Sequence, residues 1–399
     1  YEFSVLSADI LGQVYEQFLG KVIRLTEGHR AKVEEKPEVR KAGGIYYTPT
    51  YIVDYIVKNT VGKLLECGLQ NDEHRKIPLS KGGKGVVKSP LTKGETGVVN
   101  PQNPKSASKL KILDPACGSG SFLLGAYQYL LDWHRDWYIA DGPEKWATGR
   151  SPTLYQVAAQ IPLSKGGEGV VNSEIQNPNS QIRNWRLTTA ERRRILLNNI
   201  YGVDIDPQAV EVTKLSLLLK VLEGESEQTI VKQLKMFHER ALPDLGNNIK
   251  CGNSLIGTDF YNTPLTPLFR GEKMDSPLAR GAGGVSDEER RKINPFDWEK
   301  EFPEIIKPAP AGRKQGTGGF DAVIGNPPYV ILGNDIFSNA SLTYLNSYTV
   351  AHYKTDLFHL FIQRGLDLLK TNGYLGYITP NTWFTLQFTS KLRKYVLTN

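Results

Sequence analysis

The sequence predicts an α/β fold in which a doubly wound, mostly parallel sheet carries helices on both faces. Three observations indicate it. One apolar run leads into a glycine-rich turn that is followed by a helix. A second apolar run ends in an acidic residue that precedes another helix. A third apolar run is ended by two prolines. Strands are expected near residues 111–115, 200–204, 248–251, 320–325 and 374–379. Open sheets of this kind bind ligands at the carboxyl ends of their strands.

The first run ends in the turn Asp114–Gly120, and a helix is expected from Phe122 to about Leu131. Gly118 and Gly120 let the backbone turn tightly and approach a ligand closely. The helix that follows offers free N–H groups and a positive dipole. The spacing is not Gly-x-Gly-x-x-Gly, and no Gly-Lys-Ser/Thr follows. The turn therefore favours neither a dinucleotide loop nor a phosphate loop.

The second run, Asn199–Pro207, ends in acid and leads into an amphipathic helix from Pro207 to about Leu222. Pro207 fits the first helical turn, where its missing N–H costs nothing. Asp204 at the strand end can accept both hydroxyls of a ribose, as acids at this position do in dinucleotide folds. Taken alone, Asp204 is equally well interpreted as a helix cap.

The third run, Phe320–Gly325, is interpreted as a buried parallel strand that two prolines stop. The loop after it, Asn326–Tyr329, suits chemistry on a planar amino group. An Asn oxygen and a fixed backbone carbonyl can accept both hydrogens of an –NH2, while the Tyr329 ring lies against the flat group carrying it. A lone match of this length could equally be a proline-rich turn. In this chain the Asn326–Tyr329 match occurs together with the glycine-rich turn and with Asp204.

Composition narrows the class of protein. The 399 residues suffice for one large domain or two. Neither a signal segment nor an apolar run of membrane-span length occurs. Cys67, Cys117 and Cys251 stand apart, without the spacing of disulfides or zinc ligands, and the six histidines are scattered. We therefore expect a cytoplasmic protein without a metal site.

The formal net charge of +7 is concentrated in one segment of the chain. Residues 76–111 contain eight lysines and one acid, so the remaining chain is nearly neutral. A role in DNA binding is therefore argued from the site and not from bulk charge.

Two kinds of segment are expected outside the sheet. Residues 1–42 are predicted to form an N-terminal helical segment, since Ala8–Leu19 alternates at the helical period. A glycine-rich sequence recurs at Pro78–Val87, Pro90–Val99 and Pro162–Val171, in copies too short and irregular to stack as a solenoid. We expect low-complexity insertions at about 76–109, 161–180 and 271–290.

With these motifs in this order, the chain resembles gamma-class adenine-N6 DNA methyltransferases, especially the methyltransferase part of type II enzymes that fuse restriction and modification. The resemblance covers residues 43–399. It implies a Rossmann-like, S-adenosylmethionine-dependent methyltransferase domain with the activity of a site-specific adenine DNA methyltransferase. Asp114–Gly120 and Asn326–Tyr329 are highly specific as a pair.

The resemblance also implies a role for each motif residue. Cofactor contacts are implied for Thr48, Asp114, Ala116, Gly118, Gly120, Asp204 and Asn253. Catalytic roles are implied for Asn326, Pro327, Pro328 and Tyr329. Among these, Thr48 contacts the methionine carboxylate, and the Asn253 oxygen accepts from the cofactor's adenine amino group, where many relatives carry Asp. The target base stacks on Tyr329 and Phe388.

The expected substrate is double-stranded DNA whose target adenine is flipped out of the helix. A nuclease domain or subunit in the full-length protein is a further partner that the resemblance implies. Enzymes of this class continue with one more sheet strand and a target-recognition domain. We expect this chain to contain neither.

Three alternatives stay open from the sequence. A protein glutamine N5-methyltransferase uses the same Asn-Pro-Pro-Tyr geometry, because its target is also a planar amide. A truncated, non-catalytic fragment could bind cofactor or DNA without turnover. N4-cytosine methylation needs the same amino chemistry, although Asn rather than Ser before the prolines favours adenine.

Overall fold

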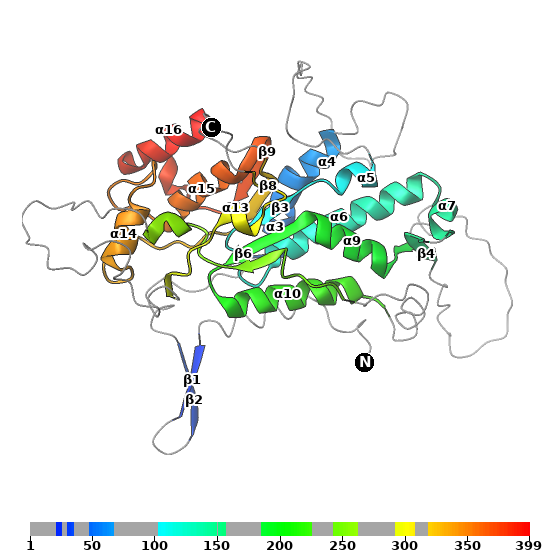
Figure 1. Cartoon of the computed structure of the whole chain (residues 1–399), viewed down its shortest axis with the longest axis horizontal. Coiled ribbons are helices and arrows are strands. Elements are labelled where there is room, and N and C mark those ends of the chain that lie inside the picture. Colours follow the sequence, from blue (N-terminus) through cyan, green and yellow to red (C-terminus); the bar gives the residue numbers. More distant parts are fainter. Residues whose placement is uncertain are drawn as a thin grey trace, which may run out of the picture.

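Five parallel strands form the central sheet of the protein, seen here in a computed structural model (Figure 1). The structure describes residues 21–25, 30–35, 48–67, 103–149, 151–156, 185–225, 242–261, 292–307 and 318–399. The strands are β3 (Ile112–Asp114), β6 (Ile200–Asp204), β7 (Ile249–Cys251), β8 (Phe320–Gly325) and β9 (Leu369–Tyr377). Each strand overlaps one of the predicted ranges.

The order of the strands across the sheet is β7-β6-β3-β8-β9, and all neighbouring pairs are parallel. The first of them in the chain, β3, therefore lies at the centre. From β3 the chain builds one side of the sheet through β6 and β7, then returns to add β8 and β9 on the other side. The winding reverses between β3 and β8, which is where doubly wound sheets hold their ligands. The predicted fold class is confirmed.

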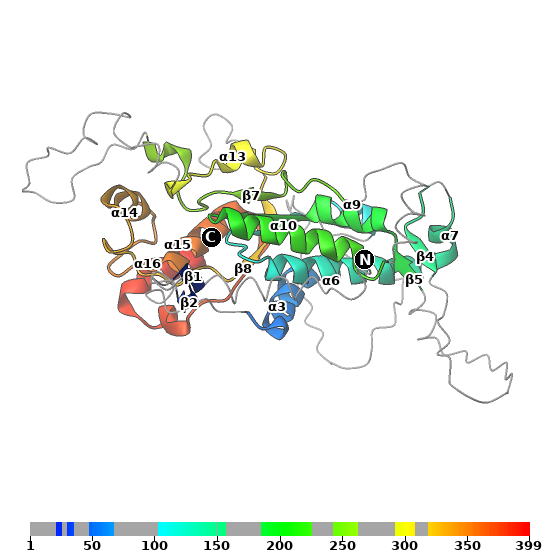
Figure 2. The same cartoon turned by 90° about the horizontal axis from the view of Figure 1, so that it is seen from below.

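One face of the sheet is covered by α3 (Thr50–Val57), α6 (Ser121–Ala140) and α10 (Pro207–Leu222) (Figure 2). The apolar sides of these helices form one buried core with strand residues such as Ile112 and Ile324. This packing removes the apolar stripes of the helices from water, which is the main favourable term in folding.

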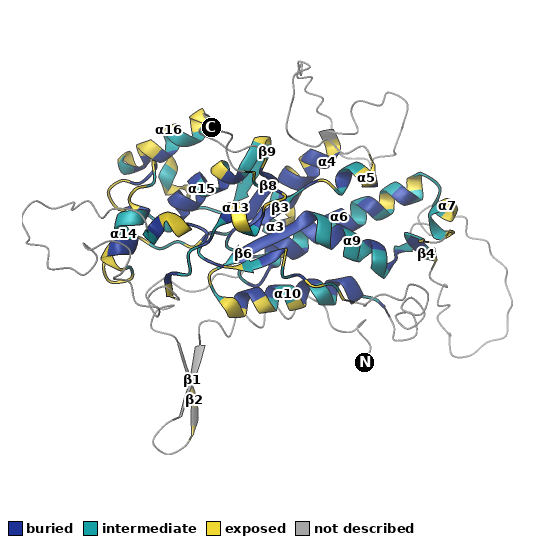
Figure 3. Cartoon of the chain, viewed as in Figure 1, coloured by how far each residue is buried: buried dark blue, intermediate teal, exposed yellow. Residues whose placement is uncertain are grey.

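The opposite face is covered by α13 (Trp298–Glu301), α15 (Leu357–Leu368) and a cluster of aromatic rings. The Phe302 ring meets Phe320 of β8 and Tyr201 of β6 edge to face, with centroids 5.8 Å apart in both pairs. Both faces are thus covered, and every residue of β3 and β8 is buried (Figure 3). Burial on two faces explains why β8 is almost continuously apolar.

The remaining elements flank this sheet. They are η1 (Lys58–Gly62), α4 (Lys63–Cys67), α5 (Pro104–Ala107), α7 (Pro143–Ala147), β4 (Leu154–Gln156), β5 (Trp185–Leu187), α9 (Thr189–Asn199), η3 (Thr258–Tyr261), α14 (Asn339–Leu345), η5 (Asn381–Phe384), η6 (Gln387–Thr389) and α16 (Ser390–Thr398). The π-helix η1 continues α3, and β4 pairs with β5 in an antiparallel ladder.

The prediction of a helical segment over residues 1–42 is wrong at two places. Lys21–Leu25 forms β1 and Ala31–Glu35 forms β2, and the two pair antiparallel as a ribbon that projects from the rest of the molecule (Figure 1). Ile23 and Val33 are register partners in the ladder. Pairing of this kind joins two separate segments, so a test for helical period within one segment cannot detect it. The predicted helix over Ala8–Leu19 lies outside the described residues.

The predicted insertion at 76–109 is wrong at its end, because residues 103–109 contain α5, which packs two of its residues into the core. Asn103 caps α5 with a hydrogen bond from Ser106 N, and Pro104 and Ala107 are buried. Nδ2 of Asn199 donates to the carbonyl oxygens of Ala107 and Leu110, both at 2.8 Å. The repeats and the predicted insertions at 161–180 and 271–290 lie outside the described residues.

Replacing Asn199 by Ala should destabilise the protein by about 1–3 kcal/mol, because each of two carbonyl oxygens loses one buried hydrogen bond. The free energy of unfolding in urea measures this loss. Asn198→Ala, one residue earlier in the same helix, is the matched control, since its side chain donates to neither carbonyl. Equal stability of the two variants would show that the Asn199 bonds contribute nothing.

Candidate active site

A cavity of about 430 Å³ lies at the carboxyl ends of β3, β6 and β8, beside the point where the winding reverses. This volume is in the range of pockets that bury a small ligand. The cavity therefore occupies the position that the sheet topology favours for a ligand.

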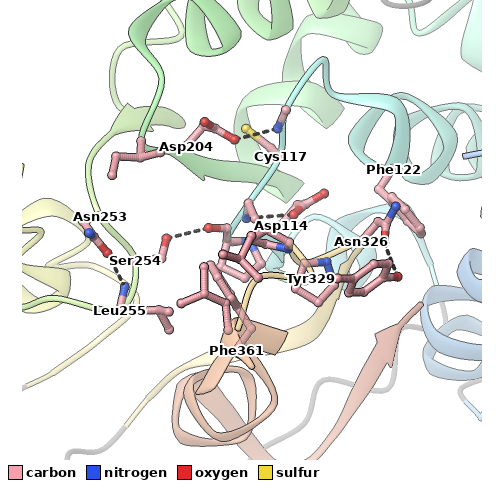
Figure 4. A pocket seen from close by; sticks show the side chains of 18 of the residues that line it. Asp114, Cys117, Phe122, Asp204, Asn253, Ser254, Leu255, Asn326, Tyr329 and Phe361 are labelled. Atoms are coloured by element: carbon pink, nitrogen blue, oxygen red, sulfur yellow. Dashed lines mark hydrogen bonds between the residues drawn. The ribbon is translucent and has the colours of Figure 1, made fainter. Parts of the chain in front are cut away.

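The structure brings most of the predicted site residues together around this cavity. Those that line it are Thr48, Asp114, Ala116, Gly118, Asp204, Asn253, Asn326, Pro327, Pro328 and Tyr329. Figure 4 shows that the side chains of Asp114, Asp204, Asn253, Asn326 and Tyr329 surround the same space. Gly120 and Phe388 are not among the lining residues.

The glycine turn is held in place by side chains from β6 and α10. The backbone N–H of Gly118 donates to Oδ2 of Asp204 at 2.8 Å, and the Thr213 hydroxyl donates to the Gly118 carbonyl oxygen at 2.7 Å. Gly120 has φ +87°, and a Cβ on it would lie 2.9 Å from Cγ2 of Thr213. Gly120 thus lets the turn pack against α10, and its contribution to the cavity is indirect.

Two carboxyl groups face the cavity. Burial raises the pKa of Asp114 to about 8, and the charge of Asp204 adds to this shift, although the hydrogen bond from Ala116 N opposes it. Burial also raises the pKa of Asp204, against hydrogen bonds from the N–H groups of Asp206 and Gly118. Two desolvated acids in one cavity favour a ligand that brings positive charge.

The wall from β7 is tied to the glycine turn. The Ser254 hydroxyl donates to the Pro115 carbonyl oxygen at 2.5 Å. Oδ1 of Asn253 accepts from Leu255 N at 3.0 Å and from Ile256 N at 3.2 Å. The oxygen expected to accept from a ligand is therefore engaged by the backbone, and the group that Asn253 offers to the cavity is the Nδ2 donor.

The loop after β8 places its amide at the cavity edge. Nδ2 of Asn326 donates to Oγ1 of Thr48 at 3.2 Å, and the Tyr329 hydroxyl donates to Oδ1 of Asn326 at 2.6 Å. The same hydroxyl lies 3.0 Å from the Ile378 carbonyl oxygen, which is a second acceptor. Burial raises the pKa of Tyr329 to about 12, so the hydroxyl stays neutral and remains a donor.

Sequence reasoning missed the apolar wall of the cavity. Phe337, Leu345, Leu357 and Phe361 supply it from the loop before α14, from α14 and from α15. The i, i+4 spacing of Leu357 and Phe361 was a usable signal for one helix face. Phe337 and Leu345 belong to no recognisable motif, and only the fold brings them to the site.

Phe388 lies in η6 and is half-buried away from the cavity lining. The exposed aromatic group in this region is Phe384, which is 60% exposed. Its ring stacks on Trp383 with centroids 4.2 Å apart. The base-stacking role of Phe388 therefore stays a prediction.

Within the ranges that the structure describes, no three His, Cys, Asp or Glu side chains converge as metal ligands. In the same ranges no helix is long and apolar enough to cross a membrane.

The sheet order and the cavity at the reversal of the winding define a Rossmann-like, doubly wound α/β protein. Residues 198–399, half of the chain, match the Eco57I restriction-modification methylase family, and the chain belongs to this family.

Comparison with curated proteins finds relatives over nearly the whole chain. It is 29% identical to the type II restriction enzyme and methyltransferase RM.Eco57I of Escherichia coli, over 100% of this chain and 29% of that protein. It is 24% identical to a type II restriction enzyme and methyltransferase assigned in Methanocaldococcus jannaschii, over 98% of this chain and 35% of that protein. The chain thus spans about a third of the length of these relatives.

The search of solved structures finds two proteins at low similarity. One is a DrdV–DNA complex, with a TM-score of 0.42 and 14% identity over 98% of this chain and 24% of that one. The other is a nuclease-deletion mutant of the Type ISP restriction-modification enzyme LlaGI with a DNA substrate mimic. Its TM-score is 0.41 with 14% identity, over 88% of this chain and 19% of that one.

Proposed function

We propose that the chain is the catalytic domain of a site-specific DNA methyltransferase that transfers a methyl group from S-adenosylmethionine to N6 of a flipped adenine. One observation carries the proposal: the amide of Asn326 stands at the edge of the same cavity that the glycine turn and Asp204 line. Its relatives' names, which join methyltransferase and restriction enzyme, support this choice.

The residues of the cavity fit S-adenosylmethionine. That cofactor carries a sulfonium and an ammonium group, and a cationic ligand favours the charged forms of Asp114 and Asp204. Asp204 can also accept the ribose hydroxyls, while Asn253 can donate to a ring nitrogen. The apolar wall around Phe361 suits a flat purine. When bound, the cofactor supplies the electrophilic methyl group.

The loop Asn326–Tyr329 acts on the target amino group. A base inside a duplex cannot reach the cavity, so the adenine must be flipped out at a cost of a few kcal/mol. Stacking on Tyr329 returns roughly 1–3 kcal/mol. Oδ1 of Asn326 and the Pro327 carbonyl accept the two amino hydrogens, which draws the nitrogen toward tetrahedral geometry as charge develops. Pro327 and Pro328 hold both acceptors in place.

The test is chemical analysis of methylated DNA. Full-length protein is incubated with a duplex library and S-adenosylmethionine carrying a labelled methyl group, and the nucleosides are then separated. N6-methyladenine is the expected product, and sequencing of DNA from expressing cells gives its position. Label in N4-methylcytosine or in protein glutamine, or binding without transfer, would replace the proposal by the corresponding alternative.

We also propose that the chain works within a longer restriction–modification protein in the cytoplasm, where its DNA substrate lies. A nuclease and a base-reading domain would then be supplied by other parts of that protein. Loss of sequence specificity on isolating residues 1–399, with recovery in the full-length protein, is the expected result.

Replacing Asp204 by Ala should weaken the binding of S-adenosylmethionine by roughly 1.5–3 kcal/mol, the size of hydrogen bonds to a charged group. It should also lower the melting temperature, because the Gly118 N–H loses its acceptor. Calorimetric titration measures the affinity. The control is Asp206→Ala, which removes the α10 cap and should lower stability without changing the affinity. Equal affinities of the wild type and Asp204→Ala for S-adenosylmethionine would show that Asp204 has only a structural role.

A further inference from the structure

Thr48 connects the cofactor side of the proposed site to the catalytic amide. It precedes α3, is 7% exposed and lines the cavity. Its Oγ1 accepts from Nδ2 of Asn326 at 3.2 Å, although 278 residues separate the two in the chain. A hydroxyl that accepts from one partner keeps its proton for another. The Thr48 proton is therefore free to point at a ligand in the cavity.

The other end of the amide meets a hydroxyl with two acceptors. Tyr329 lies 2.6 Å from Oδ1 of Asn326 and 3.0 Å from the carbonyl oxygen of Ile378. A hydroxyl has one proton, so it serves one acceptor at a time. When Tyr329 donates to Ile378, the Oδ1 atom of Asn326 is open to the target amino group.

The same three partners also satisfy a flipped amide. In that state Oδ1 of Asn326 accepts from the Thr48 hydroxyl, and Nδ2 donates to the Tyr329 oxygen while Tyr329 donates to Ile378. Both states complete their hydrogen bonds, because hydroxyl groups can donate or accept. Only the unflipped state can accept hydrogens from an amino group. In the flipped state the Nδ2 group of Asn326 and the target amino group are both donors, so no hydrogen bond forms between them.

We propose that Thr48 is a positioning residue that selects the productive orientation of Asn326 when a carboxylate-bearing ligand takes its hydroxyl proton. With the O–H held on the cavity side, only a lone pair of Thr48 faces Asn326, and that lone pair requires the amide nitrogen. The inference rests on the proposed function, in which the acceptor is the methionine carboxylate of the cofactor. Cofactor binding and recognition of the target amino group are then coupled, and the coupling is reciprocal.

The test compares binding of two duplexes, one with adenine and one with purine at the target position, since purine lacks only the amino group. The ratio of their dissociation constants reports the amino contact without turnover. S-Adenosylhomocysteine should raise the preference for adenine about three- to tenfold, the range for one hydrogen bond. 5′-Methylthioadenosine, which lacks the carboxylate, should leave it unchanged.

Variants locate the effect at Thr48. Thr48→Val removes the hydroxyl and keeps the shape, so the response to S-adenosylhomocysteine at saturation should vanish, and Thr48→Ser should restore it. Thr60→Val is the matched control, because it removes another buried hydroxyl, one that donates to the Ile56 carbonyl oxygen. It should keep the full response.

Three outcomes overturn the proposal while leaving the function standing. One is an equal response to 5′-methylthioadenosine, and another is a full response in Thr48→Val. The third is a wild-type protein that methylates DNA but never distinguishes adenine from purine in binding. If no methyl transfer occurs and adenine is never preferred, the proposed function fails together with the coupling.

Discussion

Replacing Asn326 by Ala is expected to lower the turnover of methyl transfer at least about 100-fold, while the affinity for S-adenosylmethionine changes little. In the proposed mechanism the amide is the side-chain acceptor for the target amino group, and removing one preorganised hydrogen-bonding group of this kind typically costs 10²–10³ in rate. The cofactor contacts are assigned to other residues of the cavity, including Asp114, Asp204 and Asn253. The rate is measured at saturating cofactor and DNA, and the affinity by calorimetry.

The control for Asn326→Ala is the same substitution at Asn381, an exposed residue of η5 that does not line the cavity. Wild-type turnover is expected there. The Tyr329 hydroxyl keeps the Ile378 carbonyl oxygen as its acceptor, so Asn326→Ala should fold normally. Turnover close to wild type would remove Asn326 from catalysis, and a large loss of cofactor affinity would assign it to binding instead.

Local signals in the sequence were enough to predict four of the five sheet strands and one helix closely. β8 has the predicted bounds because buried apolar residues fill it and Pro327 follows at once. α10 also has the predicted bounds, since the Asp206 side chain accepts from Gln208 N and Pro207 occupies the first turn. Such elements are set by residues within or beside them, so the pattern alone suffices.

The misses share one cause, which is dependence on partners distant in the chain. The β1–β2 ribbon depends on pairs between two strands, and α5 is held in the core by Asn199 from α9. β9 begins at Leu369, five residues before the predicted start, because Phe320 of β8 pairs with it there. No window of sequence contains both partners of these contacts.

The candidate site also contains residues that local motifs predict and contacts that depend on the fold. The motif residues could be predicted because the glycines, acids and prolines of each motif lie within a few positions of one another in the sequence. The apolar wall and the Thr48–Asn326 bond arise from elements that only the folded sheet brings together. The motifs therefore predict the class of chemistry, and the fold decides which atoms face each other.

Replacing Asp114 by Asn is expected to stabilise the protein at alkaline pH and to weaken its cofactor binding. Burial raises the pKa of Asp114 from an unfolded value near 3.8 to about 8. The folded state therefore binds the proton more tightly than the unfolded state. The contribution of Asp114 to stability is complete below about pH 4 and is lost as the pH rises toward 8. Asn resembles the protonated acid and does not titrate.

The difference in free energy of unfolding between Asp114→Asn and wild type should therefore grow by a few kcal/mol from pH 4 to pH 8 and stay constant above it. Denaturant titrations across this range measure it. Asp136→Asn, on the exposed side of α6, is the matched control for the exchange of a carboxyl for an amide group. Profiles for Asp114→Asn that run parallel to wild type would show that the carboxyl group titrates alike in the folded and unfolded states.

The same substitution should weaken S-adenosylmethionine binding at pH 8 by at least about tenfold, close to the effect of one hydrogen bond to a charged group. A cationic ligand stabilises the charged form of Asp114, so wild-type affinity should rise with pH up to about 8 as less proton has to be released. Asp114→Asn should lack this rise. A buried acid of this kind lowers the stability of the free protein and strengthens the binding of its ligand. Such a loss of stability in favour of function is expected at a binding site. An affinity that is independent of pH in wild type would place the positive charge of the ligand away from Asp114.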